Sequence, residues 1–372
     1  MGLAQTGIAA MAALSVLLTL WAVWRDIPPV WRFDMPQKLA MTQGAPRAKT
    51  VFDYRVEQGQ AHSPAIVMRD TGFELWWFEG SQEAQPDVDI HHAVFRRSPD
   101  GWQEISRGPR ITRSALGAAM DPRQLVVTLG NTVENDTRAA GGFVTVVSVG
   151  GWAMASVADV SLDQTGPVEA RKLNLSPFLN RSHLVKSPMV DFADGSHGLP
   201  AYFELGAAHG VLVRFDAQGR VRDTARMAGK NKPIQPMIVP LDAAQAVAFL
   251  RDFEPSGRLL VSRTTDGGRT WSPVVPTDLP NPSAPVAALN LGNGRILMAA
   301  NDDPDGSDRL SLLASDDGGQ SWRVLQVVEE NGAGARYPML RALPGGGLIL
   351  TYSMGNKTGL RVRLLHGDWA TA

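Results

Sequence analysis

The chain carries one octet twice. TTDGGRTW at residues 264–271 returns as SDDGGQSW at 315–322, 51 positions later. In this pattern an Asp can accept hydrogen bonds from turn amides, a Gly can adopt the left-handed backbone conformation, and a Trp can cover the adjoining strand. We therefore expect both octets to close hairpins and to take no part in chemistry.

Weaker copies of the octet extend this pattern over most of the chain, as SPDGW at 98–102, SLDQTG at 161–166 and FDAQGR at 215–220. The five copies recur at intervals of roughly 50 to 60 residues, the length of a four-stranded propeller blade with its loops. No convincing amphipathic helix interrupts the strands, so the repeat favours a propeller over a sandwich or a barrel. The β-rich segments, split by Gly, Pro, Asp and Asn, lie at 73–80, 89–97, 142–157, 246–252, 294–301, 346–353 and 360–369.

The composition excludes several classes of function. The 372 residues are 44% apolar and carry a net charge of −1, so no basic surplus indicates a nucleic-acid partner. The chain has no cysteine, which excludes disulfides, thiolate metal sites and a cysteine nucleophile. The adjacent His91 and His92 alternate along one expected strand and do not make a metal site. We expect neither a metal nor a cofactor.

The N-terminal segment differs from the rest of the chain. Residues 7–24, GIAAMAALSVLLTLWAVW, carry no charge, and 18 residues at about 1.5 Å each cross most of a bilayer core of about 30 Å. No basic residue precedes the segment and no small-x-small site follows it, which favours an uncleaved anchor over the alternative, a cleaved signal. We expect an anchor over residues 1–25 and a tether over 26–49.

The octets resemble the Asp-box repeats of the sialidase superfamily, and the resemblance extends over most of residues 50 to 365. It implies an all-β fold, a six-bladed β-propeller over residues 50–370. His62, Ser63 and Pro64 stand where the family carries Arg-Ile-Pro. The chain therefore resembles a divergent branch of bacterial neuraminidase-like proteins. Together with the expected anchor, this resemblance implies a location in the bacterial inner membrane, with the propeller in the periplasm or outside.

The resemblance also implies site residues. It places His62 and Gln82 where the family carries two arginines, and Asp87 where it carries the catalytic acid/base. It places Arg251 at a substrate-clamping arginine and Gln235 at the glutamate that polarises the nucleophile. A Gln cannot serve as that base.

Two further positions complete the implied site. Arg309 takes the place of another clamping arginine, and Tyr337 matches the nucleophile; tyrosine occurs only four times in the chain. Lys186 is a candidate cation for the mouth, and Glu204 is a candidate replacement for the missing glutamate. We expect the site residues to converge at one end of the propeller axis.

Such a group of residues suits a sugar that carries a carboxylate on its anomeric carbon. This carboxylate repels an Asp or Glu nucleophile, so a phenol attacks instead, guanidinium groups bind the carboxylate, and a carboxylic acid protonates the leaving oxygen. The resemblance thus implies an exo-glycosidase that hydrolyses a terminal sialic acid or a related acidic sugar from a glycan. The residues at positions 62, 82 and 235 leave an alternative, a catalytically inactive propeller for glycan binding or polysaccharide assembly.

Overall fold

The structure is a computed structural model, which describes residues 3–25, 30–35, 39, 41–99, 101–138, 140–175, 181–254, 256–292, 294–304, 306, 308–344 and 346–371. It contains two compact units, Met1–Trp31 and Arg32–Ala372. In its described part the first unit contains one helix, α1 (Leu3–Arg25). Within it, Gln5–Trp24 has a mean hydropathy of 2.0 and is not buried. The helix could span a membrane by length and composition, and a signal sequence would have the same properties.

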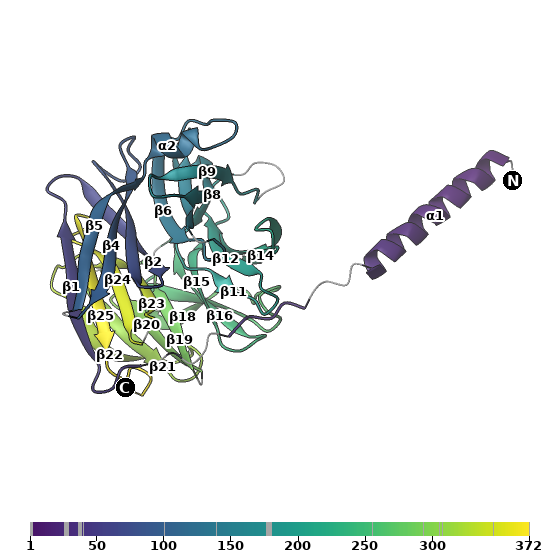
Figure 1. The fold of residues 1–372 in the computed structure, drawn as a ribbon. Helices are drawn as coiled ribbons and strands as arrows, with labels where there is room; N and C mark the ends of the chain where they lie inside the picture. The colour runs from purple at the N-terminus through teal and green to yellow at the C-terminus, as the bar shows by residue number, and fades with distance from the viewer. Residues whose placement is uncertain are drawn as a thin grey trace. The chain divides into compact units, whose positions relative to one another are not determined.

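The second unit is a six-bladed β-propeller, as the sequence predicted (Figure 1). The described strands form six antiparallel sheets, one for each blade; five consist of consecutive strands, and the sixth is completed by the N-terminal strand. The first three blades are β2 (Gln60–Arg69), β3 (Gly72–Gly80), β4 (Asp89–Ser98), β5 (Gly101–Ile111); β6 (Thr128–Glu134), β7 (Gly141–Val147), β8 (Ala155–Leu162), β9 (Pro167–Lys172); and β10 (His183–Val185) with β11 (Val190–Asp191), β12 (His197–Phe203), β13 (His209–Phe215), β14 (Val221–Met227).

The other three blades complete the ring. They are β15 (Pro233–Pro240), β16 (Ala246–Asp252), β17 (Arg258–Thr264), β18 (Val275–Pro280); β19 (Ala287–Gly292), β20 (Arg295–Ala300), β21 (Leu310–Ser315), β22 (Arg323–Glu329); and β23 (Arg336–Ala342), β24 (Leu348–Met354), β25 (Gly359–His366) with β1 (Arg47–Arg55). The N-terminal strand β1 pairs with β25, so the two ends of the propeller unit close the last blade together (Figure 1). The first strand of each blade lies innermost, as the contacts of β2 with β6 and β23 show.

The octets close hairpins between the third and fourth strands, as expected. In the first octet, the carboxylate of Asp266 accepts hydrogen bonds from Thr270 N at 2.9 Å and from Thr270 Oγ1 at 2.6 Å. Gly268 lies in the left-handed region with φ 91°, and Trp271 Nε1 donates to its carbonyl at 3.0 Å. The second octet and the three weaker copies lie at the same point of their blades. Their spacing therefore marks one blade each.

A bulge interrupts the first strand of several blades and prepares the site. The pairing register shifts between His62 and Ala65 in β2, between Leu129 and Thr132 in β6, between Ile234 and Met237 in β15, and between Arg336 and Met339 in β23. In three of these bulges the residue before a proline has a positive φ: Ser63 (56°), Gln235 (53°) and Tyr337 (58°). Proline has no N–H to donate, so it tolerates an unpaired position in a strand. Each bulge turns one side chain out of the regular alternation between the two faces of the sheet.

The start of the propeller unit differs from the expected boundary at residue 50. Phe33 N donates to Ala243 O at 2.8 Å, and Asp34 N donates to Asp191 O at 2.8 Å. The ring of Phe33 is buried and stacks on Phe192 at 5.3 Å. The described residues from Arg32 onward thus belong to the propeller unit, because this aromatic side chain is buried against it. Positions 26–29, 36–38 and 40 of the expected tether lie outside the described residues.

Two short elements interrupt the strands, although the sequence predicted no helix there. Helix α2 (Arg113–Ala118) begins at Thr112, whose Oγ1 accepts a hydrogen bond from Ala115 N at 3.2 Å. The turn η1 (Gly151–Met154) divides the expected segment 142–157 into β7 and β8. Neither element is long enough to show a helical hydrophobic period in the sequence.

Candidate active site

A cavity of about 360 Å³ lies at one end of the propeller axis. Its lining comes from the bulges of the first strands and from the loops between second and third strands. Because successive strands run antiparallel, these loops lie at the end opposite to the octet hairpins. The polar residues that line the cavity are Glu83, Asn131, Tyr202, Glu204, Gln235, Arg251, Ser283, Arg336, Tyr337 and Lys357.

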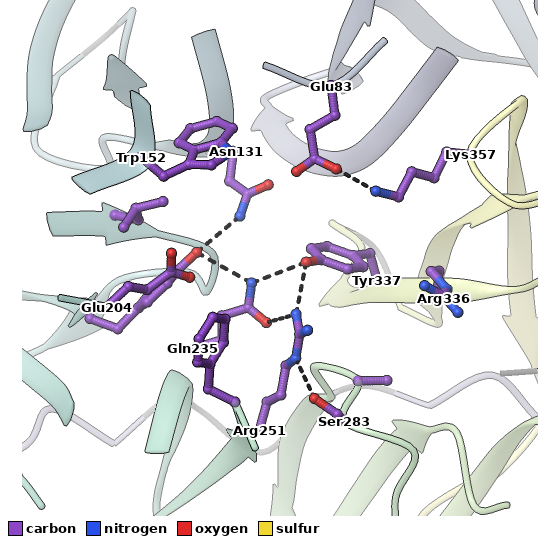
Figure 2. Close-up of a pocket in the computed structure, with 14 residues that line it drawn as sticks. Glu83, Asn131, Trp152, Glu204, Gln235, Arg251, Ser283, Arg336, Tyr337 and Lys357 are labelled. Carbon is purple, nitrogen blue, oxygen red and sulfur yellow. Dashed lines mark hydrogen bonds and ion pairs between the residues drawn. The ribbon is translucent and has the colours of Figure 1, made fainter. Parts of the chain in front are cut away.

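Tyr337 takes part in a hydrogen-bond network in this cavity (Figure 2). Its hydroxyl oxygen lies 3.1 Å from Arg251 Nη1 and 3.3 Å from Gln235 Nε2. Arg251 Nη1 also donates to Gln235 Oε1 at 3.3 Å, which fixes the orientation of the amide with its NH₂ toward the phenol. Two N–H donors therefore point at one phenol oxygen, an arrangement that stabilises negative charge on it.

Neighbouring blades hold the members of this network in place. Arg251 Nε donates to Ser283 Oγ at 3.0 Å, and that hydroxyl donates to Asp252 O at 2.6 Å. On the other side, Gln235 Nε2 lies 3.3 Å from the hydroxyl of Tyr202. The same hydroxyl accepts from Asn131 Nδ2 at 3.4 Å. The site is thus assembled from separate blades, and the second-strand residues Tyr202 and Arg251 support the two residues that project from bulges.

Two carboxylates line the cavity in different surroundings. Glu204 follows β12, and burial raises its pKa, an effect that the charge of Arg251 partly opposes and that of Glu83 reinforces. A raised pKa suits a group that must carry a proton near neutral pH. Glu83, in the loop between β3 and β4, forms an ion pair with Lys357 (Figure 2). Glu204 is therefore the better proton donor of the two.

His62 and Lys186 lie behind Tyr337 and do not line the cavity. The imidazole of His62 is 1% exposed, and its centroid lies 4.3 Å from that of the Tyr337 ring. Burial holds the pKa of His62 well below its ordinary value, and neighbouring cations, Lys357 first among them, lower it further. It is therefore neutral and supports Tyr337 as a packing surface, in contrast to the expected role of a substrate clamp.

Three further expected site residues also lie outside the cavity lining. Asp87 is exposed, and its carboxylate accepts hydrogen bonds from Ser81 N and Ser81 Oγ, both at 3.0 Å. Desolvation would raise the pKa of Asp87, but these hydrogen bonds outweigh it and lower the pKa, which disfavours a proton donor. Gln82 lies in the same exposed loop. Arg309 pairs through Nε with Asp302 Oδ1 at 3.2 Å, and its side chain is 43% exposed.

The structure thus brings together Tyr337, Arg251 and Gln235 but not the whole expected set. It adds Glu83, Asn131 and other polar residues that the sequence interpretation did not select as site residues. One signal was present in the sequence: the first strands repeat a residue followed by Pro and an apolar run, as in HSPAIV, KSPMVD, IQPMIV and RYPMLR. Reading these as one repeated bulge would have aligned Gln235 with Tyr337.

The chain belongs to the BNR repeat-like domain family, within the sialidase-like superfamily of propellers. The sequence pattern of this family matches residues 72–350 of the chain. The chain is 30% identical over 186 residues to a sialidase of Micromonospora viridifaciens. This match covers 44% of the chain and 26% of the relative, so the matched part is about a quarter of the length of that sialidase.

Solved structures share the fold at low sequence identity. A Hadza microbial sialidase has a TM-score of 0.64 at 13% identity, over 86% of this chain and 69% of that one. A protein of unknown function from Dyadobacter fermentans has a TM-score of 0.63 at 13% identity, over 86% and 99%. Trypanosoma rangeli sialidase has a TM-score of 0.61 at 12% identity, over 91% and 60%. At these identities the likeness establishes the propeller, and function depends on the site.

Proposed function

We propose that the chain is an exo-glycosidase of sialidase type, which hydrolyses a terminal sialic acid or a related acidic sugar from a glycan. The observation that carries this proposal is the phenol of Tyr337 in the axial cavity, with the N–H groups of Arg251 and Gln235 directed at its oxygen at 3.1 and 3.3 Å. Membership of the sialidase-like superfamily supports the same reaction class.

In the proposed reaction, the oxygen of Tyr337 attacks the anomeric carbon and forms a glycosyl–tyrosine bond. Arg251 and Gln235 stabilise the phenolate oxygen, whose proton passes to the solvent in the open cavity. Glu204 gives its proton to the leaving glycosidic oxygen and then accepts one from the water that breaks the glycosyl–tyrosine bond. The oxygen of Tyr337 leaves as a phenolate and takes a proton back from the solvent, so Tyr337 and Glu204 both end the cycle in their starting states.

Cations around the cavity account for the choice of an acidic sugar. Arg251, Arg336 and Lys357 line it, against the two carboxylates of Glu83 and Glu204. When Glu204 carries a proton, the three cations face one negative charge. The cavity then favours a ligand that carries a carboxylate.

A second candidate is a glycan-binding propeller without turnover. One specific observation favours it: position 235 holds an amide, and among the described residues no carboxylate lies at hydrogen-bond distance from the Tyr337 hydroxyl to take its proton. Binding and turnover therefore have to be measured separately.

An aryl α-glycoside of N-acetylneuraminic acid tests the proposal. The wild-type protein should release the phenol, and Tyr337→Phe should lower kcat by about 10³-fold or more while binding of free N-acetylneuraminic acid, measured by calorimetry, stays nearly unchanged. Tyr54→Phe is the matched control, because Tyr54 bonds to Glu79 away from the cavity. Binding without release by the wild-type protein would support the glycan-binding function instead, and absence of both would contradict the two proposals.

A further inference from the structure

Lys186 is a buried cation next to the candidate nucleophile. Its side chain is almost fully buried, with 3% of the residue exposed. Nζ donates a hydrogen bond to the carbonyl of Pro338 at 3.1 Å and lies 5.8 Å from the ring centroid of Tyr337. Within the described part of the chain, no carboxylate pairs with it, and desolvation by burial lowers its pKa to about 7.

The position of Lys186 in the ring makes this contact unusual. Lys186 follows β10 in the third blade, whereas Tyr337 and Pro338 belong to β23 in the sixth. In a ring of six, these two blades face each other across the axis. Leu184 lines the active-site cavity, and Pro188 lines a second cavity of about 300 Å³ at the opposite end of the axis. The Lys186 side chain therefore crosses the axis between the two cavities.

The carbonyl that Lys186 binds belongs to the bulge that presents the phenol. Tyr337 has a φ of 58°, a left-handed conformation that a non-glycine residue adopts at a cost in free energy. Such a conformation persists only when surrounding contacts hold it. The hydrogen bond from Lys186 falls on the next residue, Pro338, and the His62 ring packs against the Tyr337 ring. These contacts hold the turn in the orientation that Figure 2 shows, with the Tyr337 hydroxyl toward Arg251.

Packing alone does not account for a lysine at this position. Its pKa in the folded protein lies below the ordinary value of 10.5, so the folded state binds the proton less readily than the unfolded chain does. Stability therefore falls as pH drops from about 10.5 toward 7, and the buried charge costs free energy at neutral pH. A methionine fills a similar volume without this cost. A destabilising charge beside a strained residue of a cavity indicates a functional role.

We propose that Lys186 is a positioning residue for Tyr337, which holds the Tyr337–Pro338 bulge from across the propeller axis and so aims the phenol at Arg251. This inference rests on the proposed function for its kinetic consequence. Its structural consequence, the place of the Tyr337 hydroxyl, does not depend on turnover.

Two substitutions at Lys186 and one matched control test this role. Lys186→Met removes charge and donor, whereas Lys186→Gln keeps an N–H donor without the charge. Lys172→Met is the control, because Lys172 bonds to Ser148 Oγ in the second blade and does not line the cavity. Crystal structures give the conformation of Tyr337, and kinetics with the aryl glycoside give kcat and KM.

In Lys186→Met we expect Tyr337 to leave the left-handed conformation and its hydroxyl to move beyond hydrogen-bond distance of Arg251. Displacement of a reacting group by about 1 Å can cost 10²-fold in rate, so kcat should fall by roughly 10- to 100-fold, with KM changing less than about threefold. Lys186→Gln should recover part of the loss, and Lys172→Met should match the wild type.

An unmoved Tyr337 in Lys186→Met, or an unchanged kcat, would overturn the proposal. So would a rise in KM alone, which would place Lys186 in substrate binding. If Lys186→Met fails to fold, Lys186→Gln decides: a fall in kcat at nearly constant KM supports the proposal, and a kcat equal to that of the wild type overturns it. If the wild-type protein turns over no glycoside, the proposed function fails, and the crystal structures still decide the role of Lys186.

Discussion

Replacing Gln235 by Glu tests how the site activates its phenol. The substitution keeps the side-chain shape and changes one donor into an acceptor. Gln235 Nε2 lies 3.3 Å from the Tyr337 hydroxyl, and Oε1 lies 3.3 Å from Arg251 Nη1. In Gln235→Glu the phenol would donate to one carboxylate oxygen, while the other would keep Arg251 as a charged partner. The site would gain the general base that it lacks.

The size of the gain follows from this geometry. A well-placed general base contributes about 10²- to 10⁴-fold to a rate. The separation of 3.3 Å is slightly longer than the range of about 2.6 to 3.2 Å in which proton transfer is efficient, so we expect a gain at or below the low end of that range, an increase in kcat of roughly 10- to 100-fold. The neighbouring Tyr202 should tolerate the change. Burial raises its pKa well above the ordinary value, so its hydroxyl keeps a proton and can donate a hydrogen bond to the new carboxylate.

The assay is release of phenol from the aryl glycoside by the wild type, Gln235→Glu and a control. Gln245→Glu is the matched control, because Gln245 is exposed and bonds to Asp242 away from the cavity. KM should change little in both variants. An unchanged or lower kcat in a folded Gln235→Glu protein would show instead that proton removal from Tyr337 does not limit the reaction.

Three further predictions follow from the described residues. Glu204→Gln should lower kcat by about 10²-fold or more for a substrate with a poor leaving group. It should also abolish the decline in kcat as pH rises through the raised pKa of Glu204. A pH profile that keeps this decline would show that another group causes it. Asp266→Ala should lower the free energy of unfolding by about 1 to 3 kcal/mol, because the octet carboxylate accepts hydrogen bonds from Thr264 and Thr270. The kcat of the folded protein should stay constant. Calorimetry measures the stability, and kinetics measure kcat. If residues 7–24 form an anchor, the protein should leave membranes with detergent and not with salt or alkali, whereas soluble protein that begins near residue 30 would indicate a cleaved signal.

The sequence predicted the architecture because propeller blades leave a local and repeated signal. The turn chemistry of the octets depends on side chains within a few residues of one another, such as Asp266 and Thr270, so it can be read without tertiary structure. Tyr337 and Arg251 also lie together as expected. Both are fixed by bulges and strand ends that repeat from blade to blade.

The positions of the remaining site residues depend on which side chains pair with one another in the folded protein, and no local sequence pattern shows this. The loop after β3 offers carboxylates at Glu83 and Asp87, and the sequence alone does not say which one faces the cavity. In the structure, Ser81 binds Asp87 on the outer side, and Lys357 from another blade draws Glu83 toward the cavity. Arg309 likewise pairs with its neighbour Asp302.

The mass of the Tyr337 peptide during turnover shows directly whether Tyr337 is the nucleophile. Trypsin cleavage after Arg336 and Arg341 releases YPMLR, in which Tyr337 is the only tyrosine. After rapid acid quench of the wild-type protein with the aryl glycoside, part of this peptide should carry the added mass of one sugar, and Tyr337→Phe should show none. Turnover without this adduct, or with the adduct on another peptide, would contradict the assignment of Tyr337 as the nucleophile.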